Sequence, residues 1–295
     1  MSIAIADLTT VRSRHPEAIA EAAARRARRP LLGEHGRLLV IAADHPARGA
    51  LEVGGRGPVM ADRAGLLERL CLALSRPGVD GVLASADILD DLLLLGALEH
   101  KVVMGSMNRG GLRGASFELD DRFTGPGPED LARRGFDAGK LLLRLDYQDP
   151  GSLRTLESAA RVVDAMAARR LPLFIEPFLC TSSDGRLRSE LGAQAVATSL
   201  AIASGLGASS AYTWLKVPVT ADPADLERAL RATTLPVVLL GGDEEEGVYE
   251  RWRTGLRLPG VRGLVAGRAL LYPADGDVAG AVDRAVALLL SPFGV

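Results

Sequence analysis

Charged residues lie inside or just beyond several short apolar stretches of this chain, where burying an unpaired charge is costly. The set consists of Asp44, Lys140, Glu176 and Lys216. A lysine in a desolvated pocket beside another cation has a lowered pKa, so a larger fraction of it is the free amine. That amine can attack a ketone or an aldehyde to form an imine. The protonated imine then accepts electrons when a neighbouring C–C bond breaks.

The four residues supply the parts that such a reaction needs. Lys216 is the predicted nucleophile, and either Lys140 or Arg144 supplies the second cation. Glu176 is the predicted acid and base for the carbinolamine and the departing hydroxyl, with Asp44 in support. Taken singly, the two acidic residues could instead cap a loop or pair with an arginine, and Lys140 could be solvated at the start of a strand. Their occurrence as a set favours the catalytic interpretation.

The elements that must position these residues follow from the pattern of apolar residues. Short apolar runs predict eight strands, at 38–43, 81–84, 102–105, 141–145, 173–176, 212–217, 237–240 and 263–266. Helical periodicity predicts helices at 60–75, 88–98, 128–137, 152–168, 190–204, 223–232, 244–255 and 277–290. Strands that are apolar on both faces and joined by helical crossovers indicate a parallel sheet, and eight such units indicate a closed (β/α)8 TIM barrel.

The length of 295 residues and the hydrophobic content of 47% suit one large core. We expect a helical arm at 1–36, with an Ala- and Arg-rich helix at 16–29, followed by a single barrel domain at 37–295. The competing fold is a doubly wound Rossmann sheet, which would carry a Gly-x-Gly-x-x-Gly turn after its first strand. Here Asp44 and His45 follow that strand instead, so the barrel is preferred.

In a barrel, catalytic side chains come from the C-terminal ends of several strands. Asp44 ends the first predicted strand, Glu176 ends the fifth directly before Pro177, and Lys216 lies near the end of the sixth. Lys140 opens the fourth. The connection at 105–124 is long for a compact domain and is therefore a candidate lid, with a disordered insertion as the alternative.

Glycines follow the seventh and eighth predicted strands. They are Gly241, Gly242 and Gly267, the last of which directly precedes Arg268. Loops at these two places commonly bind phosphate in barrels, because glycine lets the backbone N–H groups approach an anion and arginine adds positive charge. The sequence therefore predicts a phosphate site. The alternative is that these glycines only make tight turns.

The overall composition excludes several classes of function. A formal net charge of −2 gives no reason to expect nucleic acid or a membrane surface as partner, and 4% aromatic residues leave few platforms for base stacking. Two cysteines, Cys71 and Cys180, and four histidines show no metal-binding spacing, so we expect no metal and no cofactor. The chain shows no secretory signal and no apolar stretch of about 18 residues, so we expect a soluble, cytoplasmic protein, associated as a homo-oligomer.

At these residues the sequence resembles the class I aldolases of the deoxyribose-phosphate and tagatose-bisphosphate type, over 38–272. The segments that carry the resemblance are 41–45, 140–147, 171–177, 215–218 and 264–268. The resemblance implies that Lys216 forms the imine and that Glu176 is the acid and base, with Lys140 and Asp44 as supporting polar residues. The chain departs from the tagatose pattern after the seventh strand, where Gly241 and Gly242 replace an end that contains serine.

More narrowly, the sequence resembles the barrel aldolases of myo-inositol catabolism in actinobacteria. That resemblance implies cleavage of 6-phospho-5-dehydro-2-deoxy-D-gluconate to dihydroxyacetone phosphate and malonate semialdehyde. The alternatives are an aldolase of the tagatose-, fructose-bisphosphate or deoxyribose-phosphate type, an acyl or aldol transferase on the same barrel, and a barrel that only binds a ligand. The intact Lys216 and Glu176 argue against the last, and the sparse histidines argue against a metal-dependent aldolase.

Overall fold

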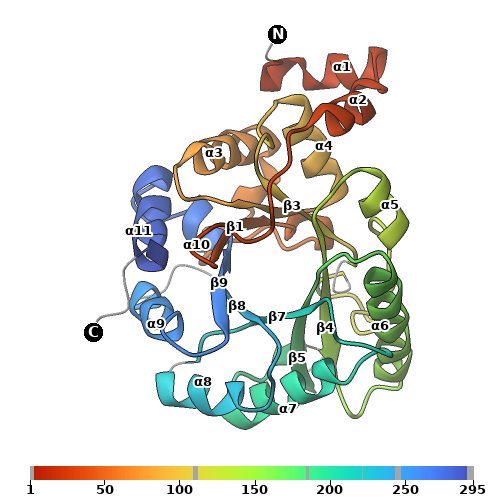
Figure 1. Ribbon diagram of the computed structural model, residues 1–295, viewed down its shortest axis with the longest axis vertical. Coiled ribbons are helices and arrows are strands. Elements are labelled where there is room, and N and C mark those ends of the chain that lie inside the picture. The colour runs from red at the N-terminus through yellow and green to blue at the C-terminus, as the bar shows by residue number, and fades with distance from the viewer. Residues whose placement is uncertain (1–2, 109–111, 184–185, 221, 243–246, 291–295) are drawn as a thin grey trace.

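The computed structural model describes residues 3–108, 112–183, 186–220, 222–242 and 247–290, and it forms a closed barrel of parallel strands surrounded by helices (Figure 1). The barrel strands are β1 (Leu38–Ala43), β2 (Gly81–Ala84), β3 (Val102–Ser106), β4 (Ala138–Leu145), β5 (Leu173–Ser183), β7 (Thr213–Val217), β8 (Val237–Leu240) and β9 (Val261–Ala266). The ring closes because β1 pairs with β9 and β4 pairs with β5. The predicted (β/α)8 barrel is confirmed.

The helices follow the strands in the order that the sequence predicts. The described helices are α1 (Leu8–Arg14), α2 (Ala18–Arg25), α3 (Arg63–Ser75), α4 (Ala86–Leu94), α5 (Pro128–Arg133), α6 (Gly151–Ala168), α7 (Ala193–Ser204), α8 (Pro223–Leu230), α9 (Val248–Gly255), α10 (Arg268–Leu271) and α11 (Val278–Leu290). The short helix α10, which begins directly after β9, was not predicted. No described helix is both long enough and apolar enough to span a lipid bilayer.

Alternation along each strand separates the residues inside the barrel from those beneath the helices. In β4, Leu141, Leu143 and Leu145 belong to the large core between strands and helices. Ala138 belongs to the smaller core inside the barrel, together with Phe174 of β5. Every second residue of β4 therefore points inward, which directs the side chains at 140, 142 and 144 toward the barrel axis.

The segment after α2 contacts the inside of the barrel. Leu31 and Leu32 pack against the inner core, as Trp214 also does. The predicted helix at 16–29 is wrong in its bounds, because α2 begins at Ala18 and the chain leaves the helix at Arg26. That departure lets the buried Arg26 guanidinium reach backbone carbonyls and a carboxylate of the barrel, as described below.

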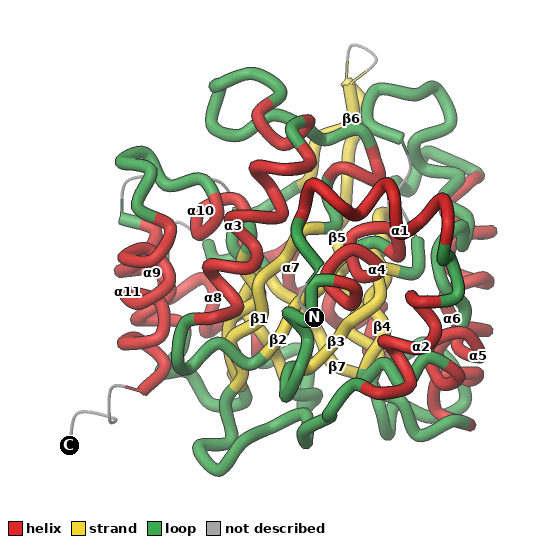
Figure 2. Tube along the Cα trace, turned by 90° about the horizontal axis from the view of Figure 1, so that it is seen from above, coloured by secondary structure: helices red, strands yellow, loops and turns green. Residues whose placement is uncertain are grey.

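The fifth strand differs from its prediction. It does not end at Glu176 but continues through Pro177 to Ser183, and its end pairs antiparallel with β6 (Arg186–Ser189) in a hairpin that projects from the barrel (Figure 2). Proline is tolerated there because β7 pairs only with residues up to Ile175, so β5 is an edge strand on that side beyond this point. The predicted helix at 190–204 accordingly begins later, at Ala193.

Candidate active site

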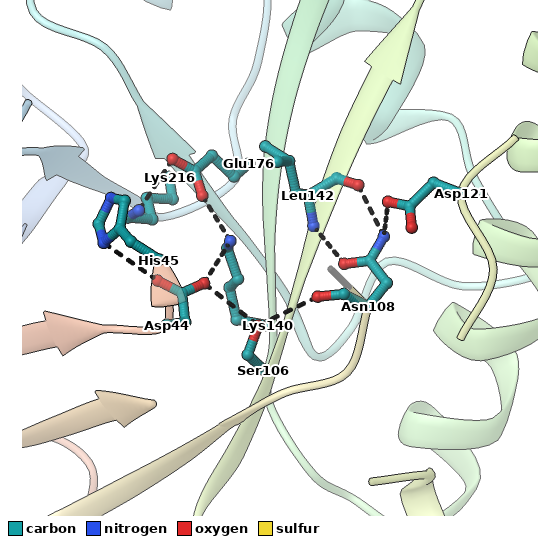
Figure 3. A network of polar contacts seen from close by, with 9 residues as sticks. All are labelled: Asp44, His45, Ser106, Asn108, Asp121, Lys140, Leu142, Glu176 and Lys216. Atoms are coloured by element: carbon teal, nitrogen blue, oxygen red, sulfur yellow. Dashed lines mark hydrogen bonds and ion pairs between the residues drawn. The ribbon is translucent and has the colours of Figure 1, made fainter. Parts of the chain in front are cut away.

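A chain of alternating charges crosses the barrel from β1 to β7 (Figure 3). Lys140 Nζ lies 2.9 Å from Asp44 Oδ2 and 2.8 Å from Glu176 Oε2. Lys216 Nζ donates to the other oxygen of that carboxylate, Glu176 Oε1, at 2.9 Å. Because two cations and two anions alternate, each buried charge has an opposite neighbour, without which its desolvation would cost several kcal/mol. The structure thus brings together the four residues that the sequence singles out.

The register of the strands explains why these side chains meet. Glu176 pairs with Leu142 across β4 and β5, and Ile175 pairs with Leu215, the residue before Lys216. The prediction that Lys140 opens the fourth strand is wrong. The strand β4 begins at Ala138, so Lys140 is its third residue. Its side chain is 5% exposed, so the alternative of a solvated lysine at the start of a strand is wrong.

The two lysines have different electrostatic environments. Burial lowers the pKa of Lys216, and the nearby charge of Lys140 lowers it further, which together outweigh the attraction of Glu176 and Asp44. Burial also acts to lower the pKa of Lys140, but two carboxylates flank this lysine and the net effect raises its pKa. Lys216 is therefore the lysine that gives up its proton more readily, and Lys140 is the cation that stays charged beside it.

The acidic groups and the neighbouring histidine are fixed in one charge state near neutral pH. Burial alone would raise the pKa of Glu176, but the charges of Lys140 and Lys216 lower it to about 2. The pKa of Asp44 is likewise held well below its usual value by Lys140, against the effect of burial. Burial lowers the pKa of His45 to about 3, so this imidazole is neutral. Its Nδ1 lies 3.9 Å from Asp44 Oδ1, too far for a hydrogen bond.

A cavity of about 170 Å³ opens above this network at the C-terminal ends of the strands. Seven of the predicted site residues line it, namely Arg144, Glu176, Lys216, Gly241, Gly242, Gly267 and Arg268. Asp44 and Lys140 belong to the charged network but do not line the cavity. Of the four residues of the charged network, a ligand in this cavity can therefore contact Lys216 and Glu176. Lys140 and Asp44 contact this pair or its neighbours from the side away from the cavity.

The glycines at this end of the barrel have a packing role of their own. A Cβ atom at Gly267 would lie 2.1 Å from the backbone oxygen of Ala42, and one at Gly241 would lie 2.8 Å from Ala266 Cβ. Gly242 has a φ of +89°, which disfavours any other residue. Close packing thus requires glycine at these positions whatever the ligand. The phosphate site at these residues stays a prediction.

Sequence reasoning missed three residues near the site. His45 and Arg48 both line the cavity, on and beside the 3-10 turn Pro46–Arg48 that follows β1. Among the described residues, the Arg48 guanidinium has no hydrogen-bond or ion-pair partner. Ser106 at the end of β3 donates to Asp44 Oδ2 at 3.1 Å. The signal that identified Asp44, a polar residue at a strand end, was also present at His45 and Ser106 but not at Arg48, which lies five residues beyond β1.

The long connection after β3 is tied to the barrel by a buried asparagine. Asn108 Nδ2 donates to Asp121 Oδ2 at 2.7 Å and to the backbone oxygen of Leu142 at 2.8 Å, while the Leu142 N–H donates back to Asn108 Oδ1 at 2.8 Å (Figure 3). Residues 109–111, which belong to the candidate lid, lie outside the described residues. Beyond them, Glu118 forms an ion pair with Arg144, with Nη1 2.6 Å from Oε1.

Within the described ranges, no three His, Cys, Asp or Glu side chains converge in a way that could hold a metal ion. Cys71 and Cys180 are both free thiols. The reactive groups that line the cavity include the amine of Lys216 and the carboxylate of Glu176.

Comparisons with known proteins give a family and a set of structural relatives. The family model described as Cgl0159-like matches residues 36–286. The crystal structure of Cgl0159 from Corynebacterium glutamicum is 51% identical, covers 96% of this chain and 95% of that one, and superposes with a TM-score of 0.93. No curated protein matches this chain.

More distant relatives share the barrel fold. An archaeal fructose-1,6-bisphosphate aldolase, described with its catalytic lysine covalently bound to the carbinolamine intermediate, is 19% identical over 92% of this chain and 99% of that one, with a TM-score of 0.66. Fructose-bisphosphate aldolase from Slackia heliotrinireducens is 17% identical over 100% of this chain and 96% of that one, with a TM-score of 0.61. These likenesses are likenesses of fold.

Proposed function

Because this chain belongs to the Cgl0159-like family and holds a buried lysine against a glutamate at the mouth of a TIM barrel, we propose that it is a class I aldolase that cleaves a phosphorylated keto-sugar through an imine on Lys216. The observation that carries the proposal is the 2.9 Å contact from Lys216 Nζ to Glu176 Oε1, beside a second lysine that stays charged. The aldolases among its structural relatives support this chemistry.

The reaction begins with a proton transfer along that contact. Lys216 gives a proton to Glu176, which leaves a free amine and a neutral carboxylic acid. The amine attacks the substrate ketone to form a carbinolamine, and Glu176 protonates its hydroxyl, which departs as water. The product is an iminium ion, and Glu176 is again a carboxylate, held by Lys140.

Cleavage follows from the positive charge of the iminium ion. Glu176 accepts the proton of the substrate hydroxyl that lies β to the imine carbon, and that oxygen becomes the carbonyl of a departing aldehyde. The electrons of the broken C–C bond flow to the iminium nitrogen and give an enamine. The enamine is protonated at carbon, and water then hydrolyses the imine to release the ketone product and the free lysine. The reaction takes place on the lysine itself and requires no metal or other cofactor.

The substrate that we propose is 6-phospho-5-dehydro-2-deoxy-D-gluconate, as the resemblance of the sequence to the aldolases of myo-inositol catabolism implies. The imine would form at C5, the bond between C3 and C4 would break, and the products would be dihydroxyacetone phosphate and malonate semialdehyde. The phosphate on C6 would lie by Gly241, Gly242, Gly267 and Arg268, where backbone N–H groups and a guanidinium can bind it.

Reduction with borohydride tests the proposal. We expect incubation with dihydroxyacetone phosphate and borohydride to attach the reduced triose to Lys216, as located by peptide mass mapping, and the Lys216→Met variant to show no adduct. The same incubation with 6-phospho-5-dehydro-2-deoxy-D-gluconate and with fructose 1,6-bisphosphate compares the candidate substrates through turnover. An active enzyme without an adduct on any lysine would disprove the mechanism.

A further inference from the structure

His45 lies on the wall of the cavity opposite Glu176. The histidine is the second residue after β1 and the glutamate belongs to β5, and these strands are four places apart in either direction around the eight-stranded ring. Both side chains line the cavity that contains Lys216. A ligand bound to Lys216 in this cavity therefore meets a carboxylate on one side and an imidazole on the other.

The imidazole of His45 is held in place but makes no hydrogen bond. Among the described residues, its buried Nδ1 atom has no hydrogen-bond partner, and its Nε2 atom has none either. The backbone at this position is fixed, because the His45 carbonyl oxygen accepts from the N–H groups of Arg48 at 3.1 Å and Ala50 at 3.2 Å. A buried polar group without a partner is unfavourable, so the ring keeps hydrogen-bonding capacity for a ligand.

Asp44 favours one of the two nitrogens of this ring for contact with a ligand. Asp44 Oδ2 accepts the hydrogen bonds from Lys140 and Ser106, whereas Oδ1 accepts none in the described part of the chain and lies 3.9 Å from His45 Nδ1 (Figure 3). A shift of about 1 Å would bring these two atoms within hydrogen-bond distance. The nearby carboxylate favours the proton on Nδ1, which leaves the lone pair on Nε2. It would also stabilise the imidazolium ion that forms when Nε2 accepts a proton.

His45 is neutral and therefore has a lone pair that can accept a proton. Burial lowers its pKa to about 3, with smaller contributions from the charges of Arg48 and Arg268, against the attraction of Asp44. Both arginines line the same cavity. A phosphate ester bound beside them would offset their charge and would make the imidazole a stronger base while substrate is bound.

One proton transfer of the proposed reaction has no carrier so far. After the C–C bond breaks, the enamine must gain a proton at carbon before the ketone product can leave. Glu176 has by then taken up the proton of the departing oxygen, and its place is against Lys216 Nζ at 2.9 Å. An enamine is planar, so a group on the opposite wall of the cavity approaches its other face.

We propose that Nε2 of His45 carries the proton at this carbon, with Asp44 as its positioning residue. The inference rests on the proposed function and deepens it, because each wall of the cavity then has its own proton transfers. In synthesis, the Nε2 lone pair takes a C–H proton from the iminium ion of dihydroxyacetone phosphate. The C–H electrons form the C=C bond of the enamine, and the C=N electrons move to nitrogen. In cleavage, the imidazolium ion, protonated from solvent after the aldehyde leaves, gives a proton to this carbon and the iminium ion forms again.

Hydrogen exchange in heavy water tests this role. Without an aldehyde, the wild-type enzyme should exchange hydrogen for deuterium at the hydroxymethyl carbon of dihydroxyacetone phosphate, as measured by loss of the proton NMR signal. In His45→Gln, whose amide cannot carry protons, this exchange should slow by about 10²- to 10⁴-fold, while borohydride trapping on Lys216 should stay within about threefold of wild type. His35→Gln, at an exposed histidine, is the matched control and should exchange at the wild-type rate.

Cleavage by the same variant should show a second signature. His45→Gln should release aldehyde in a burst of about one equivalent per active site and then turn over slowly, because the enamine accumulates. Exchange at the wild-type rate, or aldehyde release without the burst, would overturn the inference. A loss of trapping together with exchange in both His45→Gln and His45→Asn would also overturn it, because the histidine would then only hold the site in shape. No adduct on Lys216 of the wild-type enzyme would refute the aldolase proposal itself, whereas an adduct with unimpaired exchange in His45→Gln would refute only the role of His45.

Discussion

Glu176 and Lys140 are joined by an ion pair of 2.8 Å between Oε2 and Nζ, which leaves Oε1 of the carboxylate to Lys216. One carboxylate thus serves two lysines with different tasks. Lys140 holds the carboxylate in place, because its own pKa is raised and it stays charged. Whenever Glu176 is a carboxylate during the proposed reaction, Lys140 is its cationic partner, so the carboxylate does not become an unpaired buried charge.

The first prediction concerns the substitution Glu176→Gln. An amide of nearly the same shape cannot carry protons, so turnover should fall by about 10²- to 10⁴-fold, the usual contribution of general acid and base catalysis. The amine of Lys216 remains, so borohydride should still trap dihydroxyacetone phosphate on it. Near-normal turnover in this variant, measured by release of dihydroxyacetone phosphate, would show that another group moves the protons.

A second prediction concerns the pH dependence of imine formation. Only the neutral amine of Lys216 reacts, so the trapping rate should rise with pH through the lowered pKa of this lysine. Lys140→Met removes a positive charge that lowers that pKa, so the midpoint of the profile should move to higher pH. Lys101→Met, at a lysine whose Nζ donates to the backbone oxygen of Val79, is the matched control and should leave the midpoint in place. A shift to lower pH in Lys140→Met would contradict the proposed role.

Arg268→Ala tests the phosphate site. Loss of a charged hydrogen bond should raise the KM for the phosphorylated substrate by about 10- to 100-fold, with a smaller effect on kcat. Arg253→Ala, at an arginine paired with Glu250 on α9, serves as the control. A substrate analogue without the phosphate should be insensitive to Arg268→Ala, and an equal loss for both substrates would speak against phosphate binding there.

The neutral state of His45 has a consequence for stability. The folded protein holds the pKa of His45 at about 3, whereas that of an unfolded chain is about 6.5. Below pH 6.5 the unfolded state binds a proton that the folded state does not, so stability is lost as pH falls from 6.5 toward 3. Between pH 6.5 and pH 5 this contribution amounts to about 2 kcal/mol. Urea unfolding should show a weaker loss in His45→Gln, while the control His35→Gln, at an exposed histidine, should behave as wild type.

The buried arginine of the arm is predicted to stabilise the barrel strongly. Arg26 is 1% exposed and pairs with Asp137 at 3.1 Å, while its guanidinium also binds the backbone oxygens of Lys101 and Gly135. Arg26→Ala leaves two backbone oxygens without this donor, while Asp137 keeps its ion pair with Arg28, so the free energy of unfolding should fall by about 2–3 kcal/mol. Arg25→Ala, at an exposed neighbour, should change it by less than about 1 kcal/mol. Equal values for the two variants would contradict the prediction.

The barrel and its charged network could be predicted because their signals are local. Alternating apolar runs identify the strands, and a charge such as Lys216 inside such a run is rare enough to be informative. The meeting of Asp44, Glu176 and Lys216 follows from the rule that the C-terminal ends of strands meet at one face of a barrel. Lys140, predicted at the start of its strand, lies beside them because β4 begins earlier, at Ala138. Of the two candidates for the second cation beside Lys216, Lys140 forms an ion pair with Glu176, whereas Arg144 lies opposite Phe178 and forms an ion pair with Glu118. This placement supports Lys140 in the proposed role.

Other features depend on pairing between distant segments. The continuation of β5 beyond Pro177 depends on where β7 stops pairing, which no single run of residues reveals. The contact of Glu118 with Arg144 depends on how a long connection folds back over the barrel, and Asn108 fixes that path through hydrogen bonds to Leu142. Irregular backbone carries no periodic signal, so residues on it escape pattern analysis.

The alternation of β4 also limits how this protein can change over evolution. Ala138, Lys140, Leu142 and Arg144 share the inner face of one strand, and the leucines between them share the outer face. Insertion or deletion of a single residue early in β4 would exchange the two faces, so that leucines replaced both cations inside the barrel while the cations entered the packing beneath the helices. Such a change of length would remove Lys140 from the charged network and would also disrupt the hydrophobic core. This strand can therefore diversify by substitution, while changes of its length are barred unless they come in pairs of residues.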